Sequence, residues 1–590
     1  MTKNKTEKVN LFTFLWPYIW THQSTTQKIK FLIFVLSTLV TTLLIVSVPI
    51  LLKYSISVLE TKTALFGLEP IVIIMAYGAA WTLTKIIDRL RHQSAFPMIA
   101  NIIHHLCLDL FSHLQKLSMR FHYNRRSGKI FNTVSRTRYA IASFTQALSQ
   151  SLLPLILQVI LSTALLSFYF GMVYGGILLS MLIIYSALSI ASAEKIVSHR
   201  KIQNKKDGEA NAYIVDSLLN AETVKYFDMA DFEANQVHIR LKEKETADVK
   251  SLLNDAKIHL IQNGIIGLSV LSLTILSGYD VFHHVIEVSD FVMINSFILM
   301  FMSPLSSLGY QYTQAKQSIT HLESAIELLQ EPIEIQDHQK SQDLIFNKGE
   351  IEFKQVFFGY HKNRGILDKL SFHVPAGTTT AIVGESGSGK STISKLLFHL
   401  YELDSGSIII DGQNISHVTH HSLCETIGIV PQDTILFNDT LKNNIFYANP
   451  VIKPEDLDSI IKAAGLSDFI QNLPKGLETM VGERGLKLSG GERQRMAIAR
   501  MLARKPKIFI FDEATSALDL KTENQIQHCL NALSKNITTI IIAHRLSTVR
   551  HADNIIVLDK GHIAEQGTHD ILLEKNGLYC KLLSKQASHL

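Results

Sequence analysis

The sequence predicts an all-α transmembrane domain of six helices with long cytosolic helical extensions, followed by an α/β domain built around a phosphate-binding loop. Three observations lead to this fold class. Six apolar stretches in the first half are each long enough to cross a bilayer, which takes about 20 mostly apolar residues. Two long connections between them carry apolar residues at helical spacing among charges. In the second half an apolar run, a glycine-rich loop and a helical run follow one another, as a phosphate-binding loop requires.

The predicted membrane spans lie at residues 29–52, 65–87, 152–170, 172–191, 258–279 and 288–312. The third and fourth spans are nearly continuous, so we expect a tight turn at Gly171 and Gly175. Basic residues crowd the connections after the second and fourth spans, whereas the opposite side offers only Lys53 and Lys62. Because basic loops stay in the cytosol, both termini and both long connections are expected there. Before the first span, residues 11–20 predict a short interfacial helix.

The composition agrees with a protein of the lipid bilayer and argues against a nucleic-acid partner. The chain has 590 residues, of which 47% are hydrophobic and 18% are charged, with a net charge of +5. The basic loops account for this charge, and no basic patch with base-stacking aromatics accompanies it. The four cysteines share no metal or disulfide spacing. The N-terminus has no transit or signal pattern, so we expect the inner membrane of a bacterium, with an organellar inner membrane as the alternative.

The two long connections are expected to be helices that extend tens of ångströms beyond the membrane, at about 1.5 Å per residue. Residues 99–118 and 212–257 carry the helical pattern, with candidate turns at 124–128 and 219–222. The alternative is a pair of large solvated loops.

A polar stretch without periodicity separates the two parts of the chain. We therefore expect a transmembrane domain at residues 1–325, a linker at 326–348 and an α/β domain at 349–590. Residues 351–356, at the start of that domain, alternate like an edge strand.

The glycine-rich loop carries the most specific motif of the chain. It follows the apolar run 380–383 and precedes the helical run 393–400. Glycines allow successive N–H groups to point at phosphate oxygens, and the following helix adds its positive N-terminal end. Lys390 can reach the β and γ phosphates of ATP, and Ser391 can ligate Mg²⁺. The expected nucleotide-binding residues of the loop are Gly384, Glu385, Ser386, Gly387, Ser388, Gly389, Lys390, Ser391 and Thr392.

Two carboxylates end a predicted buried parallel strand at residues 508–513. Asp512 is placed to hold Mg²⁺, directly or through water. Glu513 is placed to polarise the water that attacks the γ-phosphate. A helix cap is the alternative role for such carboxylates.

A second anion site is predicted where residues 488–492 open the helix 493–503. A serine hydroxyl, glycine N–H groups and the helix dipole all favour an anion there. One domain cannot bring both anion sites to one phosphate chain if they lie far apart. We therefore expect two domains to face each other head to tail, each pair of sites enclosing one ATP. The residues that act on the partner's ATP are then Ser489, Gly490, Gly491 and Glu492.

Together these motifs resemble those of the ATP-binding cassette (ABC) transporter superfamily, over essentially the whole chain. The resemblance implies that Tyr360 stacks on adenine, and that Gln432 senses Mg²⁺ and contacts the membrane domain. It also implies that Asp519 belongs to the D-loop and that His544 is the switch histidine that contacts the γ-phosphate. The expected catalytic residues are Glu513, His544 and Lys390, and the expected Mg²⁺ residues are Ser391, Gln432 and Asp512.

The order of a six-span domain before one cassette is similar to the exporter type (type IV) of this superfamily. Residues 216–227, 395–398 and 430–440 resemble those of the mitochondrial iron–sulphur-related and heavy-metal-tolerance exporters. Those proteins are homodimeric half-transporters that handle glutathione derivatives. The resemblance therefore implies a homodimer and a thiol-peptide or metal–thiol cargo.

The expected substrate cavity combines this resemblance with polar residues inside the spans. Arg200 and Gly309 match pocket positions of the subgroup, whereas Asn204 stands where a second arginine is expected. Polar residues rarely face lipid, so those inside spans are candidates, with interhelical hydrogen bonds as their alternative role. The candidate substrate-cavity residues are Arg200, Gln262, Asn263, Gly309 and Gln311, and Gln158 is a further polar candidate.

The sequence thus predicts a homodimeric half-transporter that uses ATP and Mg²⁺ to export a small molecule across a membrane. The cargo expected from the resemblance is a glutathione derivative or a metal–thiol conjugate. A lipid or multidrug exporter would share every cassette residue and differ only in the cavity. A non-transport, ATP-gated membrane protein and a heterodimer with a degenerate partner are further alternatives.

Overall fold

The computed structural model of this chain describes all residues except 1–10, 22, 62–68, 125–126, 338–340, 362–363, 483–484, 486, 514–525, 527–529, 531, 544–548 and 588–590. The chain forms two compact units. The N-terminal unit comprises Met1–Gln115 and Ser127–Glu331, and the C-terminal unit comprises Lys116–Arg126 and Pro332–Leu590. A short segment of the first cytosolic connection is therefore part of the C-terminal unit.

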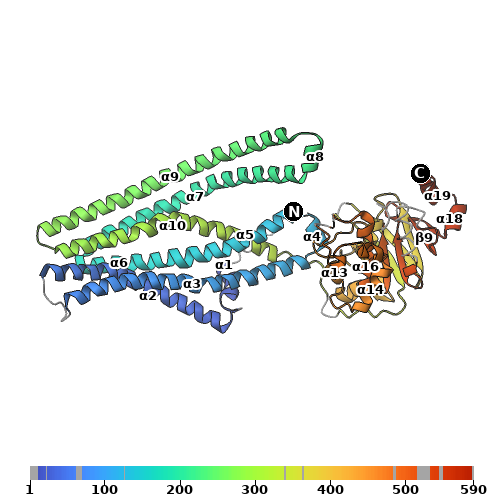
Figure 1. Cartoon of the computed structure of the whole chain (residues 1–590), viewed down its shortest axis with the longest axis horizontal. Helices are drawn as coiled ribbons and strands as arrows, with labels where there is room; N and C mark the ends of the chain where they lie inside the picture. The colour runs from blue at the N-terminus through green and yellow to red at the C-terminus, as the bar shows by residue number, and fades with distance from the viewer. Residues whose placement is uncertain are drawn as a thin grey trace. The chain divides into compact units, whose positions relative to one another are not determined.

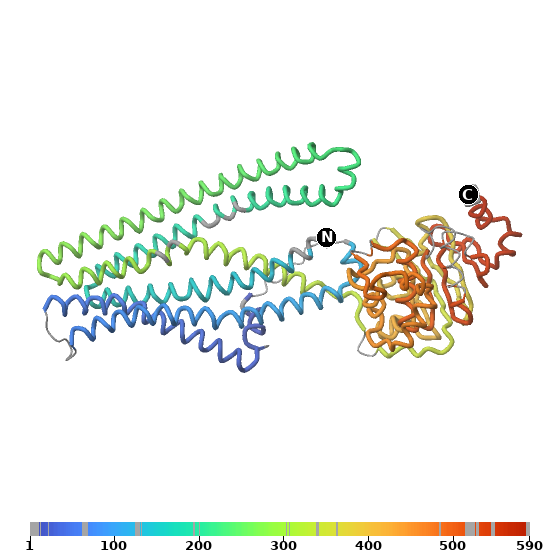
Figure 2. Tube along the Cα trace, viewed as in Figure 1, coloured from blue at the N-terminus to red at the C-terminus, as the bar shows by residue number. Residues whose placement is uncertain are grey.

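The N-terminal unit is built from helices (Figures 1 and 2). They are α1 (Leu11–Trp16), η1 (Pro17–Thr21), α2 (Thr25–Thr61), α3 (Pro70–Lys116), α5 (Ser127–Gln146), η2 (Ala147–Leu152), α6 (Leu153–Phe170), α7 (Met172–Leu219), α8 (Ala221–Tyr226), α9 (Ala230–Phe282) and α10 (Val288–Leu329). In the described part of the chain, six helical segments are long and apolar enough to cross a membrane, as the sequence predicts. A helix suits these segments because it satisfies every backbone polar group inside a bilayer.

Several helices of this unit run far beyond a membrane span. α3, α7 and α9 contain 47, 48 and 53 residues, so each is roughly 70–80 Å long at 1.5 Å per residue. The hydrocarbon core of a bilayer is only about 30 Å thick. α7 and α9 lie side by side, and α8 joins their ends (Figure 2). The predicted helical extensions are therefore confirmed.

The turns between these helices differ in detail from the predicted ones. Gly171, with a φ of 90°, separates α6 from α7. Gly175, in contrast, lies inside α7, where a Cβ atom would overlap the Ser167 hydroxyl. The second connection breaks at Asn220, and the next residue already belongs to α8. In the first connection, residues 127–128 begin α5 and do not form a turn.

Two sheets form the C-terminal unit. An antiparallel sheet of order β2-β1-β4-β5 contains β1 (Ile351–Phe358), β2 (Leu367–Val374), β4 (Ser405–Ile410) and β5 (Gln413–Asn414). A six-stranded sheet of order β10-β9-β3-β8-β7-β6 contains β3 (Thr379–Gly384), β6 (Ile427–Val430), β7 (Ile508–Asp512), β8 (Thr538–Ile542), β9 (Asn554–Asp559) and β10 (His562–Gly567). All its neighbouring strands run parallel except β9 and β10.

One strand prediction is confirmed and one is wrong. β7 is the predicted buried parallel strand, since it pairs with β6 and β8 and all its residues are buried. β1 was expected at an edge, but it pairs with both β2 and β4. The alternation in β1 reflects one buried and one exposed face of the sheet, which an interior antiparallel strand also has.

Helices cover the six-stranded sheet on both faces, as the alternating residues of β7 indicate. Ile508 and Ile510 belong to a core with β1, β2 and α11. Phe509 and Phe511 belong to a core with α13, α14 and α16. The described helices of this unit are α4 (Met119–Asn124), α11 (Lys390–Leu397), α12 (His420–Thr426), α13 (Leu441–Phe446), α14 (Pro454–Ala463), α15 (Ser467–Gln471), α16 (Gly490–Ala503), α18 (His569–Glu574) and α19 (Leu578–Ala587).

Most of the predicted linker packs with the C-terminal unit. α10 continues to Leu329, beyond the boundary expected at residue 325, and the C-terminal unit resumes at Pro332. The carboxylate of Asp411 accepts hydrogen bonds from the backbone N–H groups of residues 347–350 at 2.8–3.1 Å. This carboxylate therefore fixes the end of the linker to the antiparallel sheet.

Candidate functional site

The parallel strands bring the predicted cassette residues to one edge of the six-stranded sheet. β3 ends at Gly384, where the phosphate-binding loop begins, and β7 ends at Asp512. β6 ends two residues before Gln432. Parallel strands have their carboxyl ends at the same edge, which is where α/β sheets bind ligands. The loop, the strand-end carboxylates and Gln432 are thus placed around one space.

The loop between β3 and α11 has the backbone shape of an anion cradle. Gly387 and Gly389 have φ values of 83° and 104°, in the left-handed region that favours glycine. α11 begins directly after Gly389, so its N-terminal end faces the loop. The hydroxyl of Ser388 is buried and has no hydrogen-bond partner among the described residues. A phosphate oxygen would supply the acceptor that this hydroxyl lacks.

Lys390 folds back over this loop. Its ammonium donates hydrogen bonds to the carbonyl oxygens of Gly384 and Glu385, both at 2.9 Å. Burial lowers the pKa of Lys390, whereas the carboxylates of Glu513 and Asp512 raise it. Neutral carbonyls are weak partners for a buried ammonium, so a phosphate anion would be a better one.

Ser391 and Asp512 present oxygen atoms to the same point. The Ser391 hydroxyl donates to Asp512 Oδ1 at 3.1 Å, and the Ser394 hydroxyl donates to Asp512 Oδ2 at 3.0 Å. Burial raises the pKa of Asp512, and the two serine hydrogen bonds oppose that shift. A hydroxyl beside a carboxylate is the donor set that Mg²⁺ prefers, so these residues fit the predicted metal.

Gln432 and Glu513 meet across the mouth of this site. Gln432 Nε2 donates a hydrogen bond of 2.6 Å to Glu513 Oε2. Glu513 has a φ of 48°, in the left-handed region, and its N–H donates to the Ile542 carbonyl of β8 at 2.8 Å. Such backbone strain is typical of functional residues whose surroundings fix their geometry.

Several of these groups line a cavity of about 540 Å³, which we call the phosphate-loop pocket. The Tyr360 hydroxyl lies 3.2 Å from Thr392 Oγ1 in its wall, so the predicted adenine-stacking ring adjoins the loop. Glu385, which was also predicted to bind nucleotide, turns its side chain toward Lys585 at 3.2 Å. The pocket is lined by Tyr360, Ile366, Ser386, Gly387, Gly389, Lys390, Ser391, Thr392, Gln432 and Glu513.

The remaining predicted cassette residues do not line this pocket in the described chain. Asp519 and His544 lie outside the described residues. Ser489 caps α16 through a reciprocal pair of hydrogen bonds with Glu492, at 2.7 and 3.3 Å. The helix begins at Gly490, and the N–H groups of a helix's first turn have no partner within the helix.

Sequence reasoning missed a contact from α4 to the phosphate-loop pocket. The ammonium of Lys395 lies 5.7 Å from the ring of Tyr360 and 5.6 Å from the ring of Tyr123. Met119, also in α4, packs against the core of the C-terminal unit. The only signal in the sequence was an aromatic residue beside the candidate turn, so only the fold could reveal this contact.

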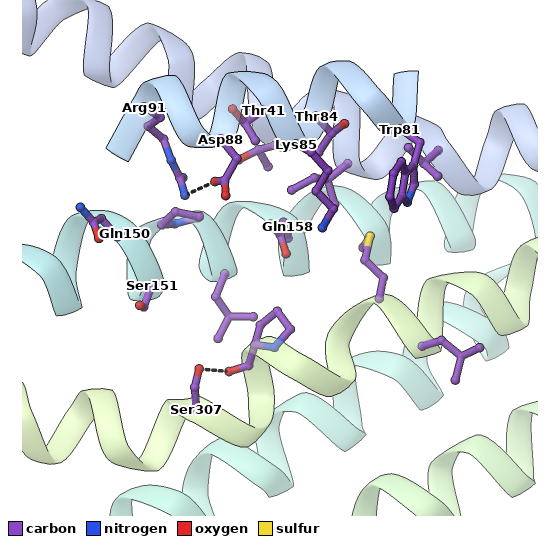
Figure 3. Close-up of a pocket in the computed structure, with 18 of the residues that line it drawn as sticks. Thr41, Trp81, Thr84, Lys85, Asp88, Arg91, Gln150, Ser151, Gln158 and Ser307 are labelled. Atoms are coloured by element: carbon purple, nitrogen blue, oxygen red, sulfur yellow. Dashed lines mark hydrogen bonds and ion pairs between the residues drawn. The ribbon is translucent and has the colours of Figure 1, made fainter. Parts of the chain in front are cut away.

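The N-terminal unit encloses a second cavity, of about 780 Å³, which we call the transmembrane cavity (Figure 3). Residues of α2, α3, η2, α6 and α10 line it. Of the predicted polar candidates, Gln158 and Gln311 are in its wall. The other polar or charged residues of the wall are Thr41, Thr42, Tyr77, Trp81, Thr84, Lys85, Asp88, Arg91, His92, Gln150, Ser151, Ser296 and Ser307.

The other predicted cavity residues are not in this wall. Gln262 donates to the Ser189 hydroxyl at 2.8 Å and lies 3.0 Å from His259 Nδ1, so it joins α9 to α7. Gly309 is buried beside Gln262, and Asn263 is exposed on α9. The side chain of Arg200 lies outside the described part of the chain. For Gln262 the alternative role, an interhelical hydrogen bond, fits the structure better.

The charged residues of α3 in this wall were not predicted as cavity residues. The sequence shows them as basic and acidic residues next to the end of the second span, and loop charge explained them equally well. Their spacing of three residues places them on one face of a continuous helix. That spacing was the available signal, and it acquires meaning only because α3 continues unbroken through this region.

Comparisons with known proteins find relatives of both parts of the chain. The family described as "ABC transporter" matches residues 367–516, and the family described as "ABC transporter transmembrane region" matches residues 31–305. The ATM1-type heavy metal exporter of Novosphingobium aromaticivorans is 36% identical over 579 residues, which cover 97% of this chain and 94% of that protein. A solved structure, titled "Structure of a bacterial Atm1-family ABC exporter with ATP bound", matches with a TM-score of 0.85 at 35% identity, covering 96% of this chain and 99% of that one.

A longer relative matches over most of this chain. The ATP-binding cassette sub-family B member 6 of Mus musculus is 40% identical over 479 residues, which cover 81% of this chain. The matched region is 57% of that protein, so this chain spans little more than half the length of that relative.

Proposed function

The chain belongs to the ABC transporter family, as an exporter of the Atm1 and heavy-metal-tolerance type, and on this premise we propose that it hydrolyses MgATP to move a thiol-peptide cargo out of the cytosol. The cargo class is a glutathione derivative or a metal–thiol conjugate. One observation carries the ATPase part: residues of the phosphate-binding loop and the Gln432–Glu513 pair line one pocket, and Asp512 is hydrogen-bonded to Ser391 of its wall.

In the proposed reaction the loop binds the triphosphate. The N–H groups of residues 386–390 and the Ser388 hydroxyl donate to phosphate oxygens. Lys390 exchanges its two carbonyl partners for the β and γ phosphates, a stronger charge-assisted contact. The ring of Tyr360 stacks on the adenine.

The same pocket supplies the groups for hydrolysis. Ser391 and Asp512 would hold Mg²⁺, and the ion would neutralise the charge that develops on the γ-phosphate. Glu513 accepts a hydrogen bond from the attacking water and orients it for in-line attack. Gln432 holds the Glu513 carboxylate at the mouth of the pocket before that water arrives. We also assign the switch role to His544.

A second copy of the chain is proposed to complete each ATP site. Ser489 and the N-terminal N–H groups of α16 form an anion site that is not part of the phosphate-loop pocket of the same chain. Two chains arranged head to tail would bring this site to the partner's γ-phosphate, with Asp519 of the D-loop beside it. Because one chain carries both kinds of site, a homodimer would have two complete ATP sites.

The cargo proposal rests on the relatives and on the polarity of the transmembrane cavity. The relative from Novosphingobium aromaticivorans is named a heavy metal exporter. The charged and amide side chains among the apolar residues of the cavity wall favour a polar conjugate over a lipid, which would be the cargo of the alternative exporter class. The chain is a multi-pass membrane protein, and we propose the inner membrane of a bacterium, with an organellar inner membrane as the alternative.

Transport into vesicles tests this function directly. The purified protein would be reconstituted into liposomes. Transporters whose cassettes lie on the outside would carry labelled glutathione disulfide into the liposomes, and this uptake would be measured with ATP or ADP outside. We expect uptake that depends on ATP and is lost in the Glu513→Gln variant. Uptake of amphiphilic drugs or lipids with no uptake of thiol peptides would establish the alternative exporter class. ATP hydrolysis without uptake of any probe would contradict the transport proposal.

A further inference from the structure

The transmembrane cavity contains an ionic group that the proposed transport cycle has not used. Lys85, Asp88 and Arg91 occupy one face of α3 at three-residue intervals and line the cavity (Figure 3). At 1.5 Å per residue, they lie roughly 22–32 Å along α3 from its start at Pro70. This position is toward the cytosolic end of the second span, where a cargo would enter.

Arg91 has hydrogen-bonding capacity that the protein leaves unused. Its residue is only 5% exposed, and its guanidinium donates to Asp88 Oδ1 at 2.6 Å. Its Nε is buried and has no hydrogen-bond partner among the residues that the structure describes. A buried donor without an acceptor is unfavourable, so a ligand oxygen would improve this arrangement.

Lys85 and Asp88 are both open to the cavity. The ammonium of Lys85 lies 5.7 Å from the ring of Trp81, and none of the described carboxylates forms an ion pair with it. The Asp88 side chain is 39% exposed, and its second oxygen lies 3.8 Å from His92 Nε2. The cluster therefore presents one carboxylate between two cations, with a net positive charge.

Stabilisation of the helix bundle does not explain this cluster. Asp88 and Arg91 are on the same helix, so their ion pair joins no two helices. Lys85 lies inside the predicted second span, and Asp88 and Arg91 lie just beyond its end. Charged residues within a span usually face a water-filled cavity and serve binding or transport. The position of the cluster in the cavity wall and its unused hydrogen-bonding and ion-pairing capacity together indicate a ligand.

We propose that Lys85, Asp88 and Arg91 bind the free α-amino-acid group of the cargo. Asp88 binds the ammonium of that group, and Arg91 and Lys85 bind its carboxylate. The cluster's one negative and two positive charges therefore complement a zwitterionic cargo that also carries additional negative charge. Gln158 and Gln311, from α6 and α10, face the peptide part. This inference rests on the proposed export of thiol peptides, and it places charge recognition on α3.

Two probes that share their ammonium groups but differ in their carboxylates test this site. Binding of glutathione disulfide and of its tetraethyl ester to the full-length protein in nanodiscs would be measured by calorimetry. The ester keeps both ammonium groups and loses all carboxylates. Lys85→Met should weaken the disulfide about tenfold, the effect of one charge-assisted hydrogen bond, and leave the ester within about twofold. Asp88→Asn should weaken both probes, because both retain the ammonium groups.

Matched controls separate recognition from folding. Lys242 and Glu245 form an exposed pair on α9 at 2.8 Å, so Lys242→Met and Glu245→Gln make the same charge changes away from the cavity. These controls should bind both probes like the natural protein. Basal ATPase activity should also be unchanged in Lys242→Met and Glu245→Gln, since neither residue lines the transmembrane cavity or the phosphate-loop pocket.

The outcomes distinguish this inference from the proposed function. If the natural protein binds and transports the disulfide while Lys85→Met and Asp88→Asn bind it equally well, the α3 site is wrong and the cargo class stands. If the natural protein neither binds nor transports the disulfide, the cargo class is wrong and the α3 site is overturned with it. An equal loss of both probes in Lys85→Met would indicate structural damage in place of carboxylate recognition, and would also overturn the inference.

Discussion

The amide of Gln432 donates a hydrogen bond of 2.6 Å to the carboxylate of Glu513 across the mouth of the phosphate-loop pocket. Glu513→Gln keeps the shape of this side chain and removes its charge and basicity. We expect ATP turnover to fall at least about 100-fold, because a general base contributes that much to a hydrolysis rate. ATP binding should persist, since Lys390 and the loop are untouched. Phosphate release and retention of labelled ATP by the purified variant measure both quantities.

A matched glutamate shows whether this effect is local. Glu478 is an exposed carboxylate of the same unit, 3.6 Å from Lys442. Glu478→Gln should leave turnover within about twofold, as surface ion pairs contribute little. Near-normal hydrolysis in Glu513→Gln would contradict the role given to Glu513.

The proposed action of Ser489 across the dimer predicts an unusual pattern of complementation. A dimer of one Lys390→Ala chain and one Ser489→Arg chain should have one intact ATP site, with both defects in the other site. A dimer of one unchanged chain and one chain with both substitutions should have a defect in each site. Differently tagged chains, purified as mixed dimers, would be compared by ATP turnover. If the doubly substituted mixture is the active one, Ser489 acts within its own chain.

Tyr123 should influence ATP affinity from outside the pocket. Lys395 lies between the rings of Tyr123 and Tyr360, and removal of one ring lets the ammonium move away from the other. A cation–π contact at an exposed position contributes about 0.5–1 kcal/mol, so Tyr123→Ala should raise the Kd for ATP about two- to fivefold. Binding would be measured in the Glu513→Gln background, with Tyr139→Ala on exposed α5 as the control. An unchanged Kd would show that this contact does not reach the nucleotide.

The anchoring of the linker by Asp411 predicts a pH-dependent stability. Burial raises the pKa of Asp411, but the N–H groups of residues 347–350 outweigh it and hold the pKa below its usual value. Asp411→Asn should lower the free energy of unfolding at pH 7 by about 1–2 kcal/mol. Because the native pKa is the lower one, this contribution is complete above the unfolded pKa of about 4 and is lost as the pH falls through the native pKa.

Denaturant unfolding at several pH values would measure the Asp411 contribution. The difference between Asp411→Asn and the natural protein should be full at pH 7 and 5 and should shrink below pH 4. Asp368→Asn is the control, since Asp368 is half-exposed and 3.5 Å from His562. A constant difference at all pH values would mean that folding does not lower the pKa of Asp411, and would contradict this prediction.

Much of this fold could be predicted because its determinants are local. Apolar runs of span length and a glycine loop between strand and helix each have few structural solutions. The strand at 508–512 was predictable because it is apolar on both faces. β1 was misplaced because its alternation reports the faces of a sheet, whereas its second neighbour, β4, is chosen by tertiary packing. The end of α10 was misplaced because polar residues are common in exposed helices as well as in linkers.

The two functional sites also differ in how much of them the sequence could predict. The cassette residues sit in motifs of fixed spacing, so most of their positions around the pocket followed from the sequence. The transmembrane cavity is formed by α2, α3, the continuous η2–α6 segment and α10, and no sequence spacing relates them. Gln262 illustrates the difficulty: a polar residue in a span faces a cavity or a neighbouring helix, and here its partners are Ser189 and His259.

The anchored linker is one of the covalent connections between the two units of the chain. At one end the carbonyl of Glu331 contacts His113 at 3.1 Å, and at the other the Asp337 carboxylate accepts from the N–H of His420 at 2.9 Å. Only residues 332–336 lie between these anchors. At roughly 3.6 Å per residue, this link lets its two anchored ends separate by no more than about 20 Å, which limits how far the two units can move apart at this connection.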